Sequence, residues 1–294
     1  MYPKAIEWYF APHEVGEVLS LLKQHGPTAK LLAGGQSLMP LMKLRLVEPQ
    51  AVIDLNRVVG LNEISANNGV VSVGAMVRHN DVANHPLICE SLPLLADAAR
   101  SIGDPQIRNR GTIAGSLVHA DPAADYPPAV SALNSRVIIA KVDGSSRAVP
   151  IEDFIIGPLT SSIAEDELVT RIEIPVPASF SGGAYSKSCQ VAGDFAIISV
   201  AAQVVFAPTG KCQQAALVVG GVMPKPARAL QAEKTLLGTT FDEDTLTQAG
   251  ETAALEVETH TDTRASAAYR QQLIRVMIPA MLRQAAARAR KANP

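Results

Sequence analysis

Aromatic residues make up only 4% of this 294-residue sequence, which excludes a core built mainly of aromatic rings. Hydrophobic residues are 47% and charged residues 18%, proportions that exclude an intrinsically disordered chain. We therefore expect a core of Val, Ile, Leu and Ala, as in folds that layer sheets and helices. The length exceeds what one small core usually organises, so two or three subdomains are expected.

Cysteine is also scarce. Cys89, Cys189 and Cys212 are widely spaced and form no C-x-x-C pair. An iron–sulfur cluster needs about four thiolates, and a structural zinc site needs closely spaced ligand pairs. The chain alone therefore predicts no metal site. An odd cysteine number without a disulfide pattern is typical of a reducing compartment, and a cytoplasmic protein is expected.

Long apolar runs and an excess of one charge are absent as well. The longest strongly apolar stretch, Phe195–Ala207, is too short for a transmembrane helix, and the start MYPKAIEWYF has no signal-peptide h-region. The net charge is −2 with acids and bases spread along the chain, so nucleic-acid binding is not expected. The exception is a basic cluster, interpreted as the solvated last turn of a helix: Arg283, Arg288, Arg290 and Lys291.

The first 57 residues predict a compact subdomain. An amphipathic helix runs from about Pro12 to Gly26, and a short strand follows at Lys30–Leu32. The segment Ala33–Ser37 is then a glycine turn, with Ser37 as the expected N-cap of a helix. A second strand is predicted at Ala51–Leu55.

From Asn62 short strands alternate with turns and helices, up to a Pro/Gly-rich stretch that begins at Pro175. We therefore predict a mixed α/β domain over residues 1–176, with subdomains 1–57 and 58–176, and an α+β domain over residues 177–294. The second domain is expected to hold a three-stranded sheet plus helices. Its predicted strands are Ala184–Ser188, Ala196–Phe206 and Gln213–Val219, and its predicted helices are Ala227–Leu237, Thr245–Val257 and Ala265–Ala287.

The turn at Ala33-Gly34-Gly35-Gln36-Ser37 has the features of an anion site. Consecutive glycines allow successive backbone N–H groups to point toward one anion, and a helix that begins directly afterwards adds its dipole. Gln36 and Ser37 can add side-chain donors. The alternative is a tight turn without a ligand, since Gly-Gly is common between a strand and a helix.

A second segment, Thr112-Ile113-Ala114-Gly115-Ser116, has the same composition of small residues and hydroxyls. Asp121 and Asp125 follow soon after. Such acids often only cap turns. An acid that serves a flavin would instead accept hydrogen bonds from ribityl or ribose hydroxyls, and Asp125 is the preferred candidate.

Competing cofactor and catalytic signatures are missing. The sequence has no G-x-G-x-x-G after a strand, no G-x-x-x-x-G-K-[ST] and no H-E-x-x-H. Its six histidines show no ligand spacing, and Lys43, Arg45 and Arg57 are interpreted as solvated charges. No acid–base pair or nucleophile stands out, so no catalytic residue is predicted.

The quoted segments together resemble a known family. AGGQSL at Ala33–Leu38 with IRNRGTIAGSLVHADPAAD at Ile107–Asp125 is similar to the FAD-binding medium subunit of molybdenum hydroxylases, the carbon monoxide dehydrogenase and xanthine dehydrogenase family. The resemblance runs nearly end to end. It includes GAYSK and GDFA within Gly183–Ala196, VGGV at Val219–Val222 and DTRASAAYRQQL at Asp262–Leu273.

The resemblance implies a FAD-binding domain of the p-cresol methylhydroxylase (PCMH)/vanillyl-alcohol-oxidase type. It implies that the FAD diphosphate is held by Ala33, Gly34, Gly35, Gln36, Ser37 and Leu38, and closed in by Thr112, Ile113, Ala114, Gly115 and Ser116. Asp125 matches a family acid near the ribityl chain, and Lys187 matches a family lysine near the flavin ring. The sequence departs from the family at Gln36, often His, at Ala114, more often Gly, and at Ser188-Cys-Gln-Val, usually basic.

The implied function is an electron-transfer flavoprotein subunit of an oxidoreductase. In such enzymes a large molybdopterin subunit oxidises the substrate, and electrons reach FAD through [2Fe–2S] clusters of a small subunit. A dimer of heterotrimers is the implied assembly. Two alternatives remain: a self-contained flavin oxidase or reductase with a similar FAD cradle, and a non-catalytic nucleotide-binding assembly subunit.

Overall fold

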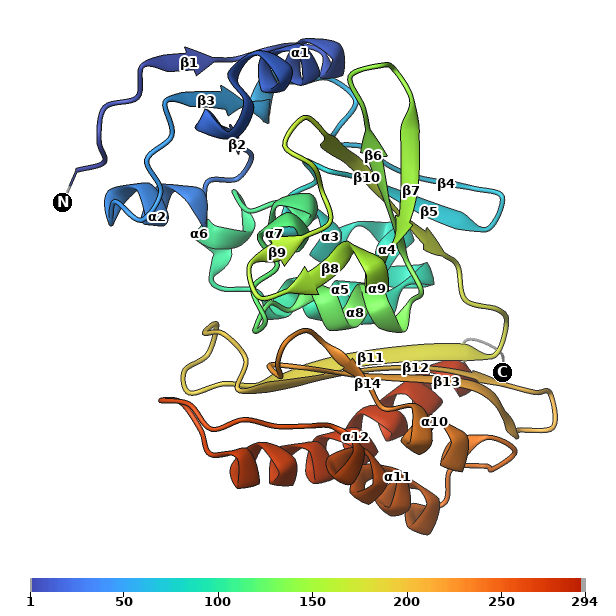
Figure 1. The fold of residues 1–294 in the computed structure, drawn as a ribbon. Helices are drawn as coiled ribbons and strands as arrows, with labels where there is room; N and C mark the ends of the chain where they lie inside the picture. Colours follow the sequence, from blue (N-terminus) through green and yellow to red (C-terminus); the bar gives the residue numbers. More distant parts are fainter. Residues whose placement is uncertain (1, 292–294) are drawn as a thin grey trace.

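Three hydrophobic clusters form the core, each built mainly on one β-sheet, and the central cluster also includes residues of the third sheet. The computed structural model describes residues 2–291. Figure 1 shows these parts as successive layers, from the N-terminal strands to the C-terminal helices. The mixture of sheets and helices confirms the predicted fold class.

The first sheet is small and parallel, with its strands in the order β1-β3-β2. The elements here are β1 (Trp8–Phe10), α1 (Val15–His25), η1 (Gly26–Thr28), β2 (Ala29–Leu32), α2 (Leu38–Lys43), β3 (Ala51–Asp54) and η2 (Leu55–Arg57). Helix α1 buries Val18, Leu19 and Leu22, which share one face because they are three and four residues apart. Since β2 and β3 are parallel neighbours, the loops after them leave the same edge of the sheet.

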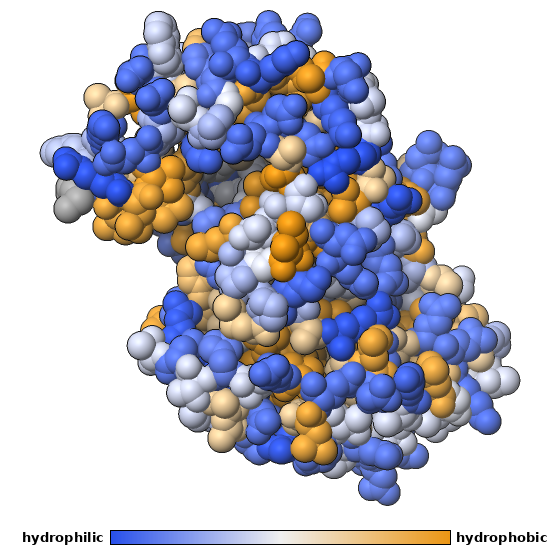
Figure 2. All heavy atoms as spheres, in the orientation of Figure 1, coloured by the Kyte–Doolittle hydropathy of each residue, from blue (hydrophilic) through white to orange (hydrophobic). Residues whose placement is uncertain are grey.

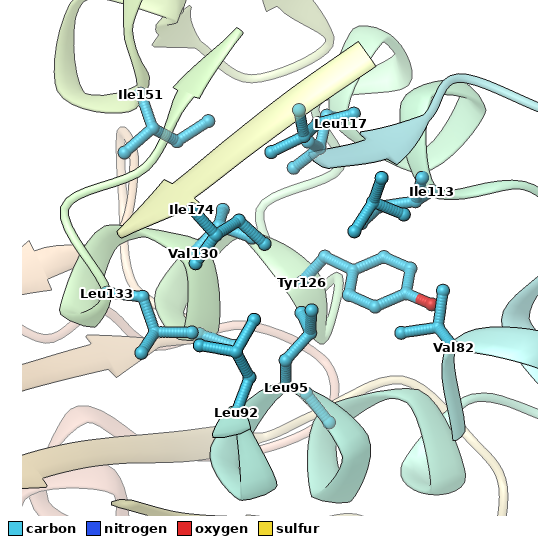
Figure 3. Close-up of a cluster of buried hydrophobic side chains, with 14 of the residues drawn as sticks. Val82, Leu92, Leu95, Ile113, Leu117, Tyr126, Val130, Leu133, Ile151 and Ile174 are labelled. Atoms are coloured by element: carbon cyan, nitrogen blue, oxygen red, sulfur yellow. The ribbon is translucent and has the colours of Figure 1, made fainter. Parts of the chain in front are cut away.

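The central region packs helices against an antiparallel sheet of order β4-β5-β10-β6-β7. Figure 3 shows its core, where Leu95 of one helix, Ile113 and Leu117 of a second and Tyr126 of a third converge. Its elements are β4 (Ile64–Asn67), β5 (Val70–Gly74), α3 (His79–Asn84), α4 (Pro86–Ser91), α5 (Pro93–Ser101), α6 (Pro105–Arg108), α7 (Ile113–His119), α8 (Tyr126–Ala132), β6 (Arg136–Ala140), β7 (Ser146–Pro150), α9 (Ile151–Phe154), β8 (Ile155–Gly157), β9 (Thr160–Ser161) and β10 (Leu168–Pro175).

The third sheet is antiparallel and covered on both faces. Its elements are β11 (Ser181–Ser188), β12 (Ile198–Phe206), β13 (Cys212–Gly220), β14 (Ala227–Arg228), α10 (Leu230–Leu236), α11 (Glu243–Glu256) and α12 (Ala267–Lys291). Helices α10–α12 pack on one face, and α5 and α8 contact the other, as Figure 1 shows. Every residue of β12 is buried, which explains the strongly apolar stretch noted in the sequence.

This sheet has four strands rather than the predicted three. The added strand, β14, lies where a helix was predicted to begin at Ala227. The N–H of Ala229 donates to the Leu217 carbonyl, which keeps the chain against β13 until α10 starts at Leu230. A strand of two residues is too short for sequence periodicity to reveal.

Arg288 corrects the interpretation of the basic C-terminal cluster as solvated. Its guanidinium lies 2.5 Å from an Asp97 carboxylate oxygen in α5 and donates to the Gly183 carbonyl in β11 at 2.7 Å. It therefore joins the last helix to the central region. The other members of the cluster are exposed, as predicted: Arg283, Arg290 and Lys291.

Apolar side chains also reach the surface near α2. Figure 2 shows them gathered over this helix, and Leu44 and Leu46, just after it, are 61% and 69% exposed. Within residues 2–291 no helix is long and apolar enough to cross a membrane.

Candidate functional site

The loop Ala33–Ser37 connects β2 to α2 and has unused hydrogen-bond donors. Gly35 has a φ of +75°, a conformation that glycine adopts without strain, and this fits the predicted anion turn. No acceptor in residues 2–291 binds the backbone N–H groups of Gly34, Gly35, Gln36 or Ser37. Such a run of unpaired N–H groups is suited to an anion.

Ser37 occupies the N-cap position of α2, as predicted, but its side chain accepts no hydrogen bond from the helix. Its backbone is already helical, with φ −105° and ψ −49°, whereas a capping serine is normally extended. The expected capping bond is therefore absent.

The segment Thr112–Ser116 was predicted to be a turn, but it forms the start of helix α7. Thr112 is its N-cap and accepts a hydrogen bond from the N–H of Gly115 at 3.2 Å. Ala114, where the family more often has Gly, lies inside the helix and does not need the conformational freedom of glycine. The side chains of Thr112, Ile113 and Ala114 are buried and face the core.

The N–H groups of residues 113–116 are all used within the protein. The first two donate to the carbonyls of Val77 and Ala75, at 3.2 and 3.3 Å. The next two donate to Thr112, one to its hydroxyl and one to its carbonyl. This segment can approach a ligand closely because its residues are small, but its backbone has no donor left over.

The two segments lie against each other. A Cβ built on Gly34 would be 2.3 Å from the Arg110 carbonyl oxygen and 2.6 Å from the Cα of Gly111. A Cβ built on Gly115 would be 3.9 Å from the Cβ of Ala33. Only glycine at position 34 allows the β2–α2 loop to touch the backbone that leads into α7.

A polar network joins the same two segments, and no motif in the sequence indicates it directly. Asn56, after β3, donates from Nδ2 to the Ala33 carbonyl at 3.1 Å. Arg78 donates from Nη2 to Asn56 Oδ1 at 2.6 Å and from Nη1 to the Arg110 carbonyl. The available clue was topological: β2 and β3 are parallel neighbours, so the residues that follow them meet at one edge.

Asp54 anchors this network from the end of β3. Burial alone would raise the pKa of its carboxyl, but hydrogen bonds from the Tyr9 hydroxyl and from Asn56 hold that pKa below its usual value. The same hydrogen bond to Asp54 raises the pKa of Tyr9. Asp54 is thus an acceptor that orients Asn56.

His79 packs against Gly111, which directly precedes the second segment. A Cβ on Gly111 would be 2.4 Å from His79 Nε2, and the imidazole meets the Tyr126 ring at 5.2 Å between centroids. Burial, followed by the charges of Arg78 and Arg108, lowers the pKa of His79 to about 4. His79 is therefore a neutral packing residue at neutral pH.

Asp125 and Lys187 form a second cluster between the central and third regions. The Lys187 ammonium lies 3.0 Å from one carboxylate oxygen of Asp125, and the Tyr185 hydroxyl donates to the other at 2.7 Å. Both charged side chains are almost completely buried. Burial raises the pKa of Asp125, and the charge of Lys187 and the hydrogen bond from Tyr185 oppose that rise.

The backbone next to this cluster is held by the third region. The N–H of Gly221 donates to the Pro122 carbonyl at 3.1 Å, and the N–H of Ala196 reaches the Ala123 carbonyl at 3.5 Å. The two motifs Gly183–Ala196 and Val219–Val222 therefore rest on the residues just before Asp125.

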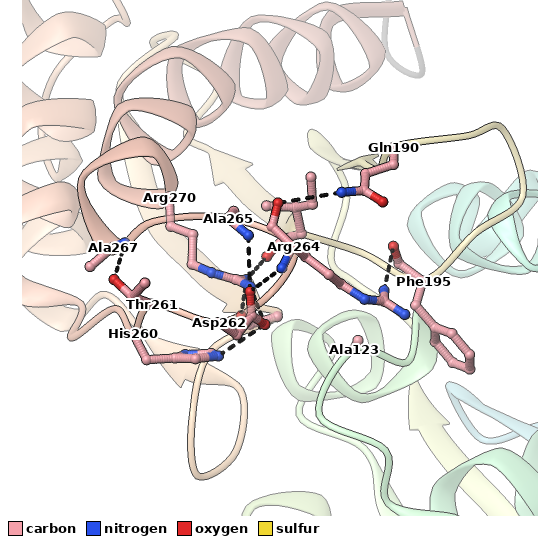
Figure 4. A network of polar contacts seen from close by, with 12 residues as sticks. Ala123, Gln190, Phe195, His260, Thr261, Asp262, Arg264, Ala265, Ala267 and Arg270 are labelled. Carbon is pink, nitrogen blue, oxygen red and sulfur yellow. Dashed lines mark hydrogen bonds and ion pairs between the residues drawn. The ribbon is translucent and has the colours of Figure 1, made fainter.

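Figure 4 shows how the C-terminal motif holds these loops. Arg270 of α12 is 2% exposed and donates to the carbonyls of Gly221, at 2.9 Å, and Ile197, and to Asp262 at 2.7 Å. Burial alone would raise the pKa of the Asp262 carboxyl. Hydrogen bonds from the N–H groups of Ala265 and Arg264, and then from Arg270, outweigh burial and lower that pKa to about 2. Arg264 also lies 5.7 Å over the Phe195 ring.

The remaining charges singled out in the sequence behave as interpreted. Lys43, Arg45 and Arg57 are exposed. Within residues 2–291, no three His, Cys, Asp or Glu side chains come together in a way that could hold a metal ion. All three cysteines are free.

Comparison with known proteins matches the whole of this architecture. Residues 4–177 match the family model described as the FAD binding domain in molybdopterin dehydrogenase, and residues 183–285 match the CO dehydrogenase flavoprotein C-terminal domain. The glyceraldehyde dehydrogenase medium chain of Sulfolobus acidocaldarius is 36% identical over 94% of this chain and 97% of its own length. The carbon monoxide dehydrogenase medium chain of Hydrogenophaga pseudoflava is 36% identical, with 98% and 99% covered.

Solved structures agree with this result. A structure of carbon monoxide dehydrogenase from Hydrogenophaga pseudoflava that lacks the Mo-pyranopterin moiety superimposes with a TM-score of 0.93 and 37% identity, over 98% of this chain and 99% of that one. Quinoline 2-oxidoreductase from Pseudomonas putida 86 gives a TM-score of 0.92 at 33% identity, with 98% and 99% covered.

Proposed function

This chain belongs to the family of FAD-binding medium subunits of molybdenum-containing dehydrogenases and hydroxylases, and from that premise we propose that it is the electron relay of a heteromeric complex. It is the FAD subunit of an oxidoreductase. FAD supplies two-electron transfer chemistry when bound. The protein's task is then to bind the cofactor, hold it in one orientation and keep its diphosphate in place.

The observation that carries the proposal is the run of unpaired N–H groups at Gly34–Ser37. A diphosphate needs several convergent donors and little side-chain bulk, and this loop offers both. Its donors also follow a parallel strand at an edge where ligands commonly bind. We therefore assign the FAD diphosphate to Ala33–Ser37, with Leu38 at the start of α2 closing the loop.

The segment Thr112–Ser116 has a different task in this proposal. Because its N–H groups are already bonded, it serves as a small-residue wall behind the diphosphate, to which the Ser116 hydroxyl can add a hydrogen bond. The close contact of Gly34 with Gly111 supports this division of labour.

Asp125 and Lys187 are assigned to the ribityl and flavin end of FAD. The Asp125 carboxylate accepts hydrogen bonds from Tyr185 and Lys187, and it has lone pairs left for a ribityl hydroxyl. The charge of Lys187 opposes the rise in the pKa of Asp125 that burial causes. The buried pair thus orients one acceptor at a fixed place.

The partners in this proposal are a large molybdopterin-binding subunit and a small [2Fe–2S] subunit, in a dimer of heterotrimers. With three cysteines, this chain falls short of the roughly four thiolates that one cluster needs, so the clusters must come from a partner. The free state of all three cysteines supports a reducing compartment such as the cytoplasm. The proposed domain division, residues 1–176 and 177–294, is supported by the stretch without helix or strand between the end of β10 at Pro175 and the start of β11 at Ser181.

The first test is Gly35→Val, with FAD affinity measured by flavin fluorescence. A branched side chain strains the φ of +75°, and we expect the affinity to fall about 100-fold or more. Gly144→Val is the matched control, because Gly144 has a φ of +83° in open space far along the chain. Unchanged FAD affinity in Gly35→Val would refute the diphosphate assignment.

The second test addresses the relay role. Co-expression with the neighbouring genes should yield a complex in which the substrate of the large subunit reduces the flavin, while the isolated chain is not reduced by that substrate. Acid denaturation should release all the yellow colour. Flavin that stays on the polypeptide, or reduction of the isolated chain's flavin by that substrate, would instead favour a self-contained oxidase.

A further inference from the structure

Arg78 links the two glycine-bearing segments through hydrogen bonds to Asn56 and to the Arg110 carbonyl. It stands between β5 and α3, and it is half-buried. Its two terminal nitrogens diverge: Nη2 donates to Asn56 Oδ1 at 2.6 Å, and Nη1 donates to the Arg110 carbonyl. Through Asn56 it reaches the first segment, and through Arg110 it reaches the second.

Asn56 is the connecting residue on the side of the first segment. Its amide nitrogen donates to the Ala33 carbonyl at 3.1 Å, while its amide oxygen accepts from Arg78. Asp54 Oδ1 accepts from the backbone N–H of Asn56 at 2.9 Å and also from its side-chain Nδ2, which fixes where that amide points. Every hydrogen-bonding group of this side chain therefore has a defined partner.

The carbonyls that Asn56 and Arg78 bind, those of Ala33 and Arg110, lie next to the point where the two segments touch. Ala33 directly precedes Gly34, and the Arg110 carbonyl is the atom that a Cβ on Gly34 would approach to 2.3 Å. Holding both carbonyls sets the distance between the loop with free N–H groups and the wall behind it. A small change there would redirect the donors of Gly34 and Gly35.

We infer that Arg78 and Asn56 are positioning residues for FAD, which clamp the two segments in the geometry that binds the diphosphate. This inference rests on the proposed function and extends it to residues outside the glycine motifs. Neither side chain needs to touch the cofactor. Their effect is to arrange the donors before FAD arrives, and such preorganisation raises affinity without adding a contact.

The geometry of the guanidinium separates this role from a simple effect of positive charge. Arginine offers a planar fork that can serve two acceptors, whereas a lysine ammonium is a point charge on a flexible stem. Arg78→Lys keeps the charge and loses the fork. Arg78→Met loses both. Asn56→Ala removes the amide that joins Arg78 to Ala33 and leaves the bond of Arg78 to the Arg110 carbonyl in place.

The experiment measures FAD affinity of the full-length chain after removal and re-addition of FAD. We expect Asn56→Ala to weaken binding about tenfold, since the side-chain connection between Arg78 and Ala33 is lost while the bond of Arg78 to the Arg110 carbonyl remains. We expect Arg78→Met and Arg78→Lys to weaken it to a similar extent as each other, by about 30-fold. Retained affinity in Arg78→Lys would show that charge alone matters and would overturn the clamp.

Two matched controls lie away from the site. Asn84 also donates its amide to a backbone carbonyl, that of Asn80, at 2.8 Å. Arg147 also forks, to Glu167 at 2.7 Å and to the Ser162 carbonyl at 2.8 Å. Asn84→Ala and Arg147→Lys should leave FAD affinity unchanged.

A second measurement distinguishes positioning from general stability. Hydrogen exchange at saturating FAD should show weaker protection of residues 34–37 in Asn56→Ala than in the wild type, with no change in the third sheet. Loss of thermal stability in the flavin-free protein with normal FAD protection of this loop would overturn the inference. If Arg78→Met does not fold, the exposed Asn56 still carries the test.

The outcome for Gly35→Val separates the two proposals. If Gly35→Val leaves FAD affinity unchanged, the diphosphate assignment itself is refuted. If Gly35→Val abolishes binding while Asn56→Ala and Arg78→Met leave it unchanged, the site stands and only the clamp is refuted.

Discussion

The two small-residue segments of this protein have similar compositions but differ in what their backbones can still offer. Residues 34–37 have N–H groups without an acceptor in the described chain, whereas residues 113–116 donate all of theirs to protein oxygens. Glycine and alanine content therefore indicates how closely a ligand can approach. It does not indicate whether donors are available, because that depends on what the neighbouring strands and caps have already bound.

The largest expected effect concerns exchange of these amides. With free FAD at 1,000 times its Kd, binding should add about 4 kcal/mol of protection to residues 34–37, because the ligand must leave before the loop is exposed. Residues 113–116 should be protected with or without FAD. Hydrogen exchange followed by mass spectrometry on both forms tests this. Equal FAD-dependent protection of the two segments would contradict the comparison.

Acid should lower the free energy of unfolding through His79, which packs beside the second segment. Its pKa falls from 6.5 to about 4 on folding, so the unfolded chain takes up the proton first as pH decreases. Stability from this group is complete above pH 6.5 and is lost as pH falls toward 4, by about 3 kcal/mol.

The measurement is the free energy of urea unfolding of the full chain between pH 7 and pH 4. His79→Leu should show a flatter pH dependence than the wild type. His13→Leu, which changes an exposed histidine before α1, should keep the wild-type slope. If the free energy of unfolding depends on pH equally in wild type and His79→Leu, His79 is not the source of the acid sensitivity.

Gly34→Ala tests the contact between the segments. Its Cβ would meet the Arg110 carbonyl oxygen and the Gly111 backbone, so the two segments must separate. We expect FAD affinity to fall about 50-fold, which corresponds to about 2.3 kcal/mol. Gly16→Ala in α1, where nothing lies within 4 Å of the added Cβ, is the control. A tolerated Gly34→Ala would mean that the segments do not need this approach.

The smallest effect is expected for Ala114→Gly, which restores the residue more common in the family. Ala114 is helical, so glycine should lower stability by about 0.5–1 kcal/mol. FAD affinity should stay within about twofold, since the segment donates no free N–H. Thermal unfolding and fluorescence titration measure the two quantities. A clear gain in FAD affinity would show that this segment needs a more flexible backbone.

Local features of the site were predictable because local chemistry determines them. The glycine pair after β2 predicted a turn between a strand and a helix, and Gly35 makes that turn with a positive φ. The apolar stretch that forms β12 predicted a strand, but its burial on both faces also requires α5 and α8. The start of α7 was mistaken for a turn because threonine and glycine also occur at helix beginnings.

Long-range side-chain contacts were not predictable. Asn56 and Ala33 are 23 residues apart, and Arg288 meets Asp97 across 191 residues. Nothing in the local pattern distinguishes Arg288 from the solvated arginines of the same helix, because all of them follow the same helical periodicity. Only the packing of the layers decides which charges become partners.

The double burial of β12 has a consequence for how the protein is made. The central region is missing an apolar covering until β11, β12 and β13 arrive, since Tyr185, Ala201, Ala216 and Val218 belong to its hydrophobic cluster. During translation, a nascent chain that ends near residue 176 therefore presents an uncovered face. That face is sealed only after Gly220 has left the ribosome, so the cofactor-binding half should mature late, although it is synthesised first.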